Sequence, residues 1–347
     1  MKECLNYEKI DAQTLQCQAC SHFCKIKKGR VGVCGIRQNI GGKLYLLTYG
    51  KAAAAHIDPI EKKPLFHFLP GSLSYSLGTI GCNFRCANCQ NYDISQIFGL
   101  KGRVREYSKL NWGFDLAPEE IVREALKNKC QSISYTYTEP TIFAEYALDT
   151  MKLAKKQGIK NIWVSNGFMS QKTLDAIGPY LDAINVDIKS FDEEFYESNC
   201  GARLNPVLEN CKRLAEERVW LEITTLIIPT LSDDEKMLKK IARFIKKELG
   251  DFVPWHVSAF SGAISWKLKH LPDTPVATVK KACAIGKKEG LKYVYTGNIW
   301  EDGVENTLCP QCGKVAIKRA GFSVERLDKN GKCLSCGKIL DGVFGVE

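Results

Sequence analysis

The sequence predicts an α/β protein, built as a partial, open (β/α)6 TIM-like barrel between a cysteine-rich start and a zinc-ribbon-like tail. Apolar, strand-like runs alternate with helical patterns from residue 74 to residue 300, and such alternation predicts a parallel sheet. Six runs fit an open barrel better than a closed eight-stranded one. The cysteines gather before, within and after this region. We therefore expect three parts, at 1–73, 74–300 and 301–347.

The composition indicates an ordinary globular protein, with 45% hydrophobic and 25% charged residues among 347. No run approaches the roughly 18 apolar residues of a membrane span, and the first residues are polar rather than a signal segment. We expect a cytoplasmic protein without membrane contact. Thiols stay reduced in that compartment, so the sixteen cysteines are interpreted as metal ligands. The net charge of +10 is scattered over helix faces and does not by itself predict a nucleic-acid partner.

The first part carries four cysteines in a C-x2-C-x3-C-x9-C pattern, at Cys17, Cys20, Cys24 and Cys34. Four thiolates at such spacing can close around one metal ion or one cluster. Gly29, Gly32 and Gly35 suit the tight chain reversal that this needs, and His22 is a candidate to replace one thiol. The sequence leaves zinc and an iron–sulfur cluster open as alternatives.

Two further features precede the first long strand. The run 44–49 is expected to be a strand, because it follows a Gly-Gly turn. The proline-rich stretch 58–71 is expected to take a rigid, extended path. It either lines the mouth of a site or forms a solvated loop over the core.

The central part is expected to contain six strands and a series of helices. The strands are rich in β-branched and aromatic residues, as expected of parallel strands covered on both faces. They are placed at 74–80, 132–137, 161–165, 183–188, 219–228 and 255–260, with an extra candidate at 292–296. Helices are placed at 118–129, 141–157 and 232–249. A proline in the first turn, Gly158 after the second helix and a capping box from Ser232 to Glu235 support them.

The tail contains two C-x2-C-G turns, with Cys309 and Cys312 in the first and Cys333 and Cys336 in the second. Their spacing is typical of a four-thiolate zinc ribbon. The runs 315–318 and 322–327 between the turns are expected to form a short hairpin. A segment of this size lacks a core of its own, so we expect bound Zn²⁺ to stabilise it.

The stretch around which the chain is organised follows the run 74–80. It holds three cysteines in a C-x3-C-x2-C spacing, at Cys82, Cys86 and Cys89. A [4Fe–4S] cube normally takes four thiolates, so three on one short loop leave one iron open for a small molecule. An open metal position is typical of a catalytic site. The alternatives are a zinc knuckle and three unrelated buried thiols.

Polar residues follow several of the other expected strands. Glu139 comes after the second strand, and Asn166 after the third. Asp187 and Lys189 are two residues apart on the fourth strand and should share a face, and His256 lies on the sixth. The carboxyl ends of parallel barrel strands meet at one rim, so we expect these side chains to lie near the cysteine loop. Buried charges need partners, which another charge or a bound cofactor would provide.

The cysteine loop resembles the signature of the radical S-adenosylmethionine (SAM) family. In that family the open iron binds the amino and carboxylate groups of SAM, and one electron from the reduced cluster yields methionine and a 5′-deoxyadenosyl radical. The stretches Ser165-Asn166-Gly167, Asp187-Ile188-Lys189 and Pro254-Trp255-His256 resemble cofactor-binding stretches of the pyruvate formate-lyase activating enzymes. The cysteine-rich start, the stretches 58–64 and 135–140, and the cysteine-rich tail together resemble the radical enzyme of the AmmeMemoRadiSam system.

Two positions depart from the family pattern. Tyr137 and Thr138 stand where the family has two glycines before a glutamate, which Glu139 retains. Asn88 stands where an aromatic residue before the third cysteine contacts adenine. The backbone contacts of the glycines must therefore be provided in another way, and the packing of the adenine must come from elsewhere or be weaker.

The resemblance implies that the three loop cysteines hold a [4Fe–4S] cluster and that five residues bind SAM: Glu139, Asn166, Asp187, Lys189 and His256. It implies an oxidoreductase of the activating-enzyme type that cleaves SAM reductively and abstracts hydrogen from an unidentified protein or small molecule. The implied partners are a low-potential electron donor, of flavodoxin or ferredoxin type, and a protein substrate or system partner. The alternative is a non-catalytic, metal-dependent protein that binds nucleic acid or another protein and uses its cysteines structurally.

Overall fold

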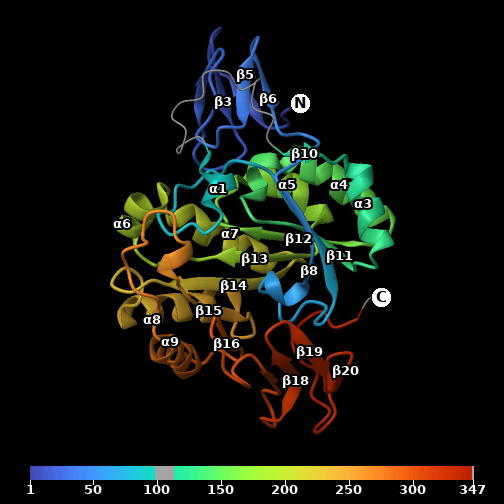
Figure 1. Cartoon of the computed structure of the whole chain (residues 1–347), viewed down its shortest axis with the longest axis vertical. Coiled ribbons are helices and arrows are strands. Elements are labelled where there is room, and N and C mark those ends of the chain that lie inside the picture. The colour runs from blue at the N-terminus through green and yellow to red at the C-terminus, as the bar shows by residue number, and fades with distance from the viewer. Residues whose placement is uncertain (98–112, 346–347) are drawn as a thin grey trace.

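The computed structural model describes residues 1–97 and 113–345. Its centre is an eight-stranded sheet in the order β16-β15-β14-β13-β12-β11-β9-β8 (Figure 1). The strands are β8 (Ala54–Pro59), β9 (Leu73–Gly78), β11 (Ser132–Tyr135), β12 (Lys160–Ser165), β13 (Ala183–Asp187), β14 (Trp220–Ile227), β15 (Trp255–Ala259) and β16 (Val294–Gly297). The strands from β9 to β16 pair in parallel, whereas β8 is antiparallel to β9. Among the described strands the pairing ends at β8 and β16, so the sheet is open.

Helices connect the successive parallel strands and cover the sheet. The longer ones are α3 (Pro118–Lys127), α4 (Ala144–Lys156), α5 (Gln171–Ile177), α7 (Asn205–Glu216), α8 (Glu235–Phe244) and α9 (Val276–Glu289). Short turns of helix are α1 (Tyr92–Ser95), α6 (Glu193–Phe195), η1 (Ile60–Lys62), η3 (Pro140–Phe143), η4 (Gly178–Tyr180), η5 (Tyr196–Cys200), η6 (Ile245–Leu249) and η7 (Gly262–Ile264). In α8 the buried residues Met237, Leu238 and Ile241 recur at helical spacing, which places one apolar face against the core.

The mixed α/β class and all six predicted strands are confirmed, with ends shifted by one or two residues, and the extra candidate is β16. The pairings show an open sheet and no closed barrel among the described strands. Strand β8 was not expected, and it extends the central sheet with residues assigned to the first part. The predicted capping box is wrong: Asp234 caps α8 by accepting from the Met237 amide at 2.9 Å. The Ser232 hydroxyl instead accepts from the Ile228 amide and donates to Leu226.

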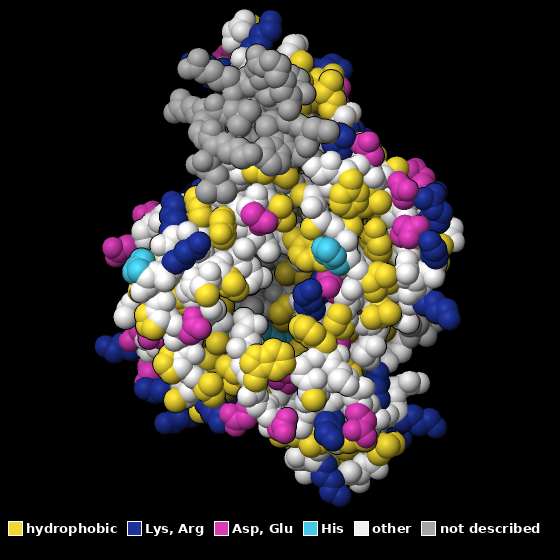
Figure 2. All heavy atoms as spheres, viewed as in Figure 1, with side chains coloured by type: hydrophobic (Ala, Val, Ile, Leu, Met, Phe, Trp, Pro, Cys, Tyr) yellow, Lys and Arg dark blue, Asp and Glu magenta, His cyan; other side chains and the backbone are white. Residues whose placement is uncertain are grey.

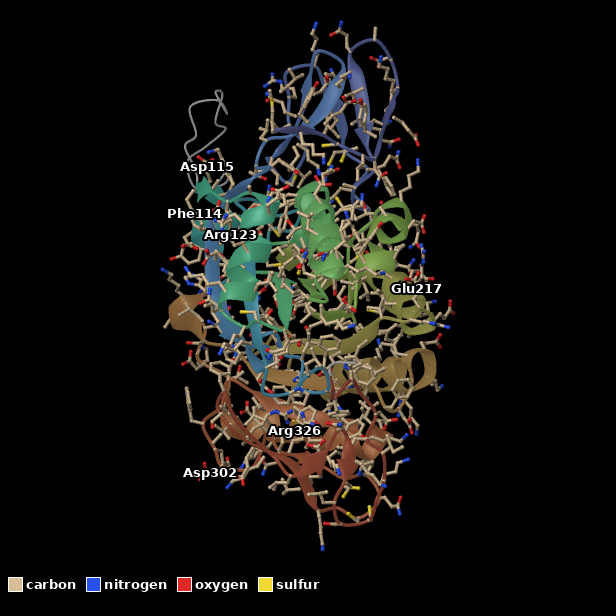
Figure 3. The ribbon with its side chains drawn as sticks, turned by 90° about the vertical axis from the view of Figure 1, so that its right-hand side faces the viewer. Phe114, Asp115, Arg123, Glu217, Asp302 and Arg326 are labelled. Atoms are coloured by element: carbon tan, nitrogen blue, oxygen red, sulfur yellow. The ribbon has the colours of Figure 1, made fainter. Side chains whose placement is uncertain are left out.

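The first residues form two small sheets at one end of the molecule (Figures 1 and 3). One sheet contains β1 (Lys2–Glu3), β5 (Arg37–Ile40) and β6 (Lys43–Leu46), and the other contains β2 (Tyr7–Lys9), β3 (Thr14–Cys17) and β4 (Lys25–Lys27). Strand β6 is the predicted strand 44–49 in shorter form. The pair β7 (Lys51–Ala52) and β10 (Phe114–Asp115) lies nearby. A buried ion pair fixes this module on α4, since Arg37 Nη2 lies 2.5 Å from Glu145 Oε2.

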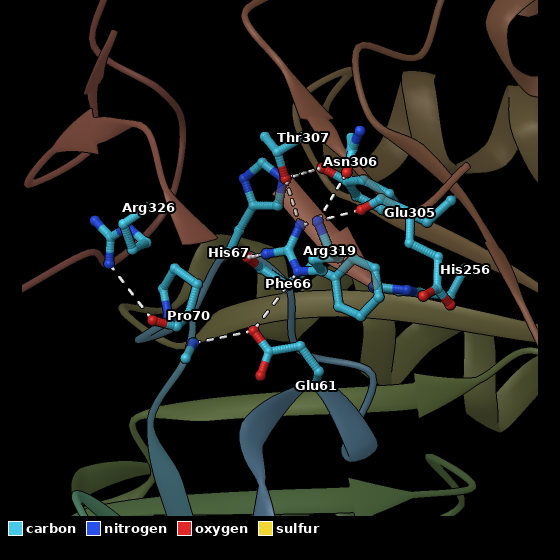
Figure 4. Close-up of polar contacts among 12 residues, drawn as sticks. Glu61, Phe66, His67, Pro70, His256, Glu305, Asn306, Thr307, Arg319 and Arg326 are labelled. Carbon is cyan, nitrogen blue, oxygen red and sulfur yellow. Dashed lines mark hydrogen bonds and ion pairs between the residues drawn. The ribbon is translucent and has the colours of Figure 1, made fainter. Parts of the chain in front are cut away.

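The tail lies at the opposite end, where Figure 3 labels Arg326. It contains β17 (Thr307–Leu308), β18 (Val315–Ala320), β19 (Ser323–Arg326), β20 (Asp328–Lys329) and β21 (Lys332–Cys333). The antiparallel pair β18 and β19 confirms the predicted hairpin. Arg319 of β18 is buried against the segment after η1 (Figure 4): it donates to Phe66 O at 2.7 Å, and its Nε lies 3.6 Å from Glu61 Oε1.

All sixteen cysteines are free thiols in this structure. Within residues 1–97 and 113–345, no helix has the length and apolar character needed to cross a membrane.

Substituting Arg319 by alanine should destabilise the protein by about 3–5 kcal/mol, because it leaves the Glu61 carboxylate buried without its cation. The free energy of unfolding in urea measures this loss. Lys318→Ala is the matched control: Lys318 is exposed and lies 3.7 Å from Glu325, and such surface pairs contribute about 0–1 kcal/mol. Equal losses in the two variants would contradict the structural role given to Arg319.

Candidate active site

A cavity of about 1220 Å³ lies at the carboxyl ends of the parallel strands. Figure 2 shows the hollow near the centre of the molecule's face. All eight residues expected at the central site line it: Cys82, Cys86, Cys89, Glu139, Asn166, Asp187, Lys189 and His256. The structure therefore brings together side chains from five strand ends, as parallel topology requires. Their individual roles remain predictions.

Backbone contacts fix the shape of the cysteine loop. Gly81 has φ = 87°, and a Cβ there would lie 2.5 Å from the Cys34 carbonyl oxygen, so only glycine fits. The Arg85 guanidinium donates to the Cys82 carbonyl at 2.7 Å, and the Arg85 amide donates to Cys200 O at 2.7 Å. These bonds determine the loop path without using the thiols, which line the cavity.

Cys86 is buried and the other two loop cysteines are half-buried, and desolvation raises the pKa of Cys82 and Cys89 above the usual thiol value. The neighbouring thiol of Cys200 and burial together raise the pKa of Cys86. Metal binding must therefore displace protons from these groups. Cys200 could not be predicted as a neighbour of this loop, because it lies far along the chain in η5, outside any cysteine spacing pattern.

The spacing of the sulfurs distinguishes two kinds of metal site. Sulfurs bound to one zinc ion at 2.3 Å lie roughly 3.8 Å apart, whereas thiolates on different irons of a cube lie farther apart. Within the described residues, one group of metal-ligand atoms has all its members within 4.8 Å of one another. It consists of the sulfurs of four tail cysteines, Cys309, Cys312, Cys333 and Cys336, which we call the tail quartet. The three loop thiols do not all lie within that distance of one another, so the zinc-knuckle alternative is not supported.

Glu139 is a buried carboxylate held by neutral donors. Its Oε1 accepts from the Thr141 amide, the Thr141 hydroxyl and the Ser165 hydroxyl at 3.1, 2.5 and 2.8 Å. Its Oε2 accepts from the Asn166 amide at 2.8 Å. Burial raises the pKa of Glu139, and these hydrogen bonds oppose the shift. No ion pair found among the described residues includes Glu139, so a cationic ligand group would complete its environment.

Tyr137 explains how the chain manages without the family's first glycine. Its φ of 66° lies in the left-handed region, which glycine adopts freely and tyrosine does not. The side chain is held in place: its hydroxyl donates to Asp58 at 2.6 Å, and Lys63 Nζ lies 5.1 Å from the ring centroid. Asn91 donates to the Tyr137 carbonyl at 2.7 Å. Strained backbone of this kind is concentrated at functional sites.

Asn166 connects the cysteine loop to Glu139. Its side-chain amide donates to Asn83 Oδ1 at 2.8 Å, one residue after Cys82, while its backbone amide donates to Glu139. Its own Oδ1 accepts from the Phe168 amide at 3.0 Å. Asn166 therefore positions two other parts of the site.

Asp187 and Lys189 form a charge pair at 3.0 Å in the cavity wall. This pairing agrees with the expectation that they share a face. Burial alone would lower the pKa of Lys189, but Asp187 and the thiols of Cys86 and Cys200 outweigh it and raise the pKa. Lys189 is therefore a cation close to the cysteine loop.

His256 of β15 lies against Glu222 of β14. His256 Nε2 lies 2.6 Å from Glu222 Oε2, and Glu222 also accepts from the amides of Phe66 and His67 at 3.0 and 2.8 Å. The ring packs edge-on to Phe66 at 4.7 Å. His256 thus has a satisfied Nε2, as a core histidine has, and also lines the cavity.

Asn88 occupies the position where the family pattern has an aromatic residue. Its Oδ1 accepts from the Asn199 side chain at 2.9 Å, and it lines the cavity. An amide in this orientation offers hydrogen bonds in place of an aromatic face.

The tail quartet forms a compact set of ligands. Cys309 Sγ lies 3.6 Å from Cys336 Sγ, and Cys312 Sγ lies 3.8 Å from Cys333 Sγ. These distances fit four thiolates around one tetrahedral ion. The four cysteines expected to act together are therefore brought together.

Comparisons with known proteins agree with this site. The model of the radical SAM superfamily matches residues 77–245. An uncharacterized protein of Methanocaldococcus jannaschii is 41% identical over 347 residues, covering 99% of this chain and 100% of its own. The pyruvate formate-lyase-activating enzyme of Clostridium pasteurianum is 25% identical over 186 residues, covering 51% of this chain and 72% of its own.

A solved radical SAM methyltransferase of Sphaerobacter thermophilus shares the fold, with a TM-score of 0.50 and 13% identity over 66% of this chain and 67% of its own. The chain belongs to the radical SAM superfamily and is a radical SAM enzyme. This membership implies a [4Fe–4S] cluster and SAM as its cofactors.

Substituting Glu139 by glutamine should destabilise the protein by about 1–3 kcal/mol. The side-chain nitrogen of the new glutamine would face the backbone amide of Asn166, and these two buried donors would then lack an acceptor between them. Urea unfolding of the metal-free protein measures this loss without any cofactor. The control is Glu120→Gln, whose half-exposed carboxylate forms a surface pair with Arg123. A loss at Glu139 no larger than at Glu120 would show that the hydrogen-bond network does not stabilise the site.

Proposed function

We propose that this enzyme cleaves SAM reductively at a [4Fe–4S] cluster held by Cys82, Cys86 and Cys89 and abstracts hydrogen from a substrate. When bound and reduced, the cluster supplies one electron to SAM, giving methionine and a 5′-deoxyadenosyl radical that takes a hydrogen atom. The observation that carries the proposal is the cavity itself: three thiols that are not gathered as for one zinc ion line it together with a buried carboxylate that has no cationic partner among the described ion pairs. The protein's task is to position the cofactor and exclude water.

The surrounding side chains receive separate roles in this proposal. Glu139 would accept a hydrogen bond from the amino group of SAM, whose N–H bonds are polarised by the iron that binds the nitrogen, so that its buried hydrogen-bond network gains an electropositive donor. Lys189 faces the carboxylate of SAM, and Asp187 accepts a hydrogen bond from the ribose. Asn166 orients the loop through Asn83, and His256 forms a wall of the cofactor site.

The substrate class and partners are also proposals. A protein substrate is supported by the activating-enzyme relative and by the exposed Trp300 and Phe322, which line the cavity near the tail. A flavodoxin or ferredoxin would supply the low-potential electron. The unpaired thiols support a reducing compartment, and we assign the enzyme to the cytoplasm.

We retain the division into 1–73, 74–300 and 301–347 as a proposal, with β8 exchanged into the central sheet. The same proposal includes a central part curved into a partial (β/α)6 barrel and a tail that is a zinc ribbon. The alternative of a non-catalytic binding protein is not favoured, because it gives no role to the cavity that the eight predicted site residues line.

The enzyme, reconstituted without oxygen and reduced, should convert SAM to 5′-deoxyadenosine, and Cys82→Ala should lose at least 100-fold of this activity because the cube loses one of three ligands. Liquid chromatography of the products measures it. Cys283→Ala, which changes a buried thiol on α9 away from the cavity, is the matched control and should keep the activity. A Cys82→Ala protein as active as this control would exclude the proposed cluster.

The tail should hold about one zinc ion per chain, since its four sulfurs fit one tetrahedral site. Cys312→Ser combined with Cys336→Ser should lose that zinc and make the tail sensitive to protease, because small metal modules unfold without their ion. Metal analysis and limited proteolysis measure both effects, with Cys283→Ser as control. An unchanged zinc content would refute a zinc ribbon.

A further inference from the structure

The N-terminal quartet of Cys17, Cys20, Cys24 and Cys34 forms one group of thiols in the folded protein. The Cys17 amide donates to the Cys24 carbonyl at 2.9 Å, and the Phe23 amide donates to the Cys20 carbonyl at 3.1 Å. A Cβ on Gly32 would lie 3.6 Å from Cys24 Sγ. The chain has therefore gathered the quartet predicted from its spacing.

The spacing of the quartet differs from that of the tail. No three of its sulfurs all lie within 4.8 Å of one another, although the tail quartet meets this condition within the same described residues. Four thiolates on one zinc ion would meet it, whereas four thiolates on the corners of a cube would not. The N-terminal quartet shares this wider spacing with Cys82, Cys86 and Cys89. This comparison favours an iron–sulfur cluster over zinc.

The quartet is packed directly on the catalytic cysteine loop. His22, between Cys20 and Cys24, lies with Nε2 2.8 Å from the Asn83 carbonyl, next to Cys82. On the other side of Cys82, Gly81 is so close to Cys34 that a Cβ would lie 2.5 Å from the Cys34 carbonyl oxygen. Arg85 of the loop donates to Val33, the neighbour of Cys34. Both residues that flank Cys82 thus contact the quartet region: Asn83 contacts His22, and Gly81 contacts Cys34.

The burial of the quartet gives it an inner and an outer side. Cys17, Cys20 and Cys34 are buried, while Cys24 is partly exposed next to the exposed Phe23. The cavity must admit SAM and the substrate from its own side. An electron donor that docks at the Cys24 side does not compete with them.

We propose that the N-terminal quartet holds a second [4Fe–4S] cluster that passes electrons to the site cluster. A reduced ferredoxin or flavodoxin gives one electron to this second cluster, which is reoxidised as it passes that electron on. The final acceptor is the sulfonium of SAM, whose C–S bond breaks as in the proposed function, on which this relay role rests. The presence of the cluster does not depend on that function.

The first test is iron content in a variant that lacks the catalytic ligands. Cys82→Ala/Cys86→Ala/Cys89→Ala, purified and reconstituted without oxygen, should keep roughly four irons per chain and a [4Fe–4S] Mössbauer spectrum. Cys4→Ala in the same background should keep them as well, although Cys4 lies close to Cys17 and Cys34. A triple variant with no iron and a second zinc would overturn the proposal. Loss of iron with Cys4→Ala would overturn the ligand assignment.

The second test separates the relay from a structural role. Cys20→Ser/Cys24→Ser should lose at least tenfold of 5′-deoxyadenosine formation with reduced ferredoxin but keep it with titanium(III) citrate, a small reductant able to reach the site cluster directly. Equal rates with both donors, or equal loss with both, would refute the relay. If the wild-type protein forms no 5′-deoxyadenosine while the triple variant keeps its irons, the proposed function fails and the second cluster stands.

Discussion

The site depends on one buried charge. Glu139 brings a carboxylate into the protein interior, where it is held by donors from Thr141, Ser165 and Asn166. Because burying a charge is costly without a partner, these bonds fix its position, and Asn166 transmits that position to the cysteine loop through Asn83. The carboxylate and the thiols therefore keep one mutual geometry before any ligand arrives. Such preorganisation is what a radical enzyme needs from its protein.

A second set of buried polar contacts connects the cavity wall to distant parts of the chain. Glu222 binds His256 and the amides that follow the Lys62-Lys63-Pro64 stretch, and Asp58 binds Lys63 and Tyr137. Arg319 then fixes the tail against the same segment. Buried ion pairs contribute little net stability compared with apolar packing. Their value here is that they specify where each segment lies.

Local patterns were enough for much of the fold and for the site's members. The C-x3-C-x2-C spacing and the polar residues after each strand could be predicted because parallel strands bring their carboxyl ends to one rim. Strand β8 was missed because its run is partly exposed and ends in Asp58-Pro59, a pair more typical of a turn than of a strand. The cap of α8 was misplaced because Ser232 and Asp234 both suit that role, and the hydroxyl of Ser232 is instead used within the preceding loop, by Ile228 and Leu226.

Other features arise only when the chain is folded. The contacts of Arg37 with Glu145, of Glu222 with His256 and of Cys200 with the loop join residues far apart in sequence. Tyr137 was interpreted as a departure from the family, but its hydroxyl contact with Asp58 holds it in a glycine-like conformation. Cysteine spacing could not distinguish zinc from a cluster, because that choice depends on distances between sulfurs.

The central claim is that one iron of the site cluster is open and binds SAM. Electron–nuclear double resonance of the reduced protein with SAM carrying ¹⁵N in its amino group and ¹⁷O in its carboxylate tests it most directly. Hyperfine coupling from both labels to the cluster is the predicted result. A reduced cluster that shows no coupling to either label, in a protein saturated with SAM, would contradict the account.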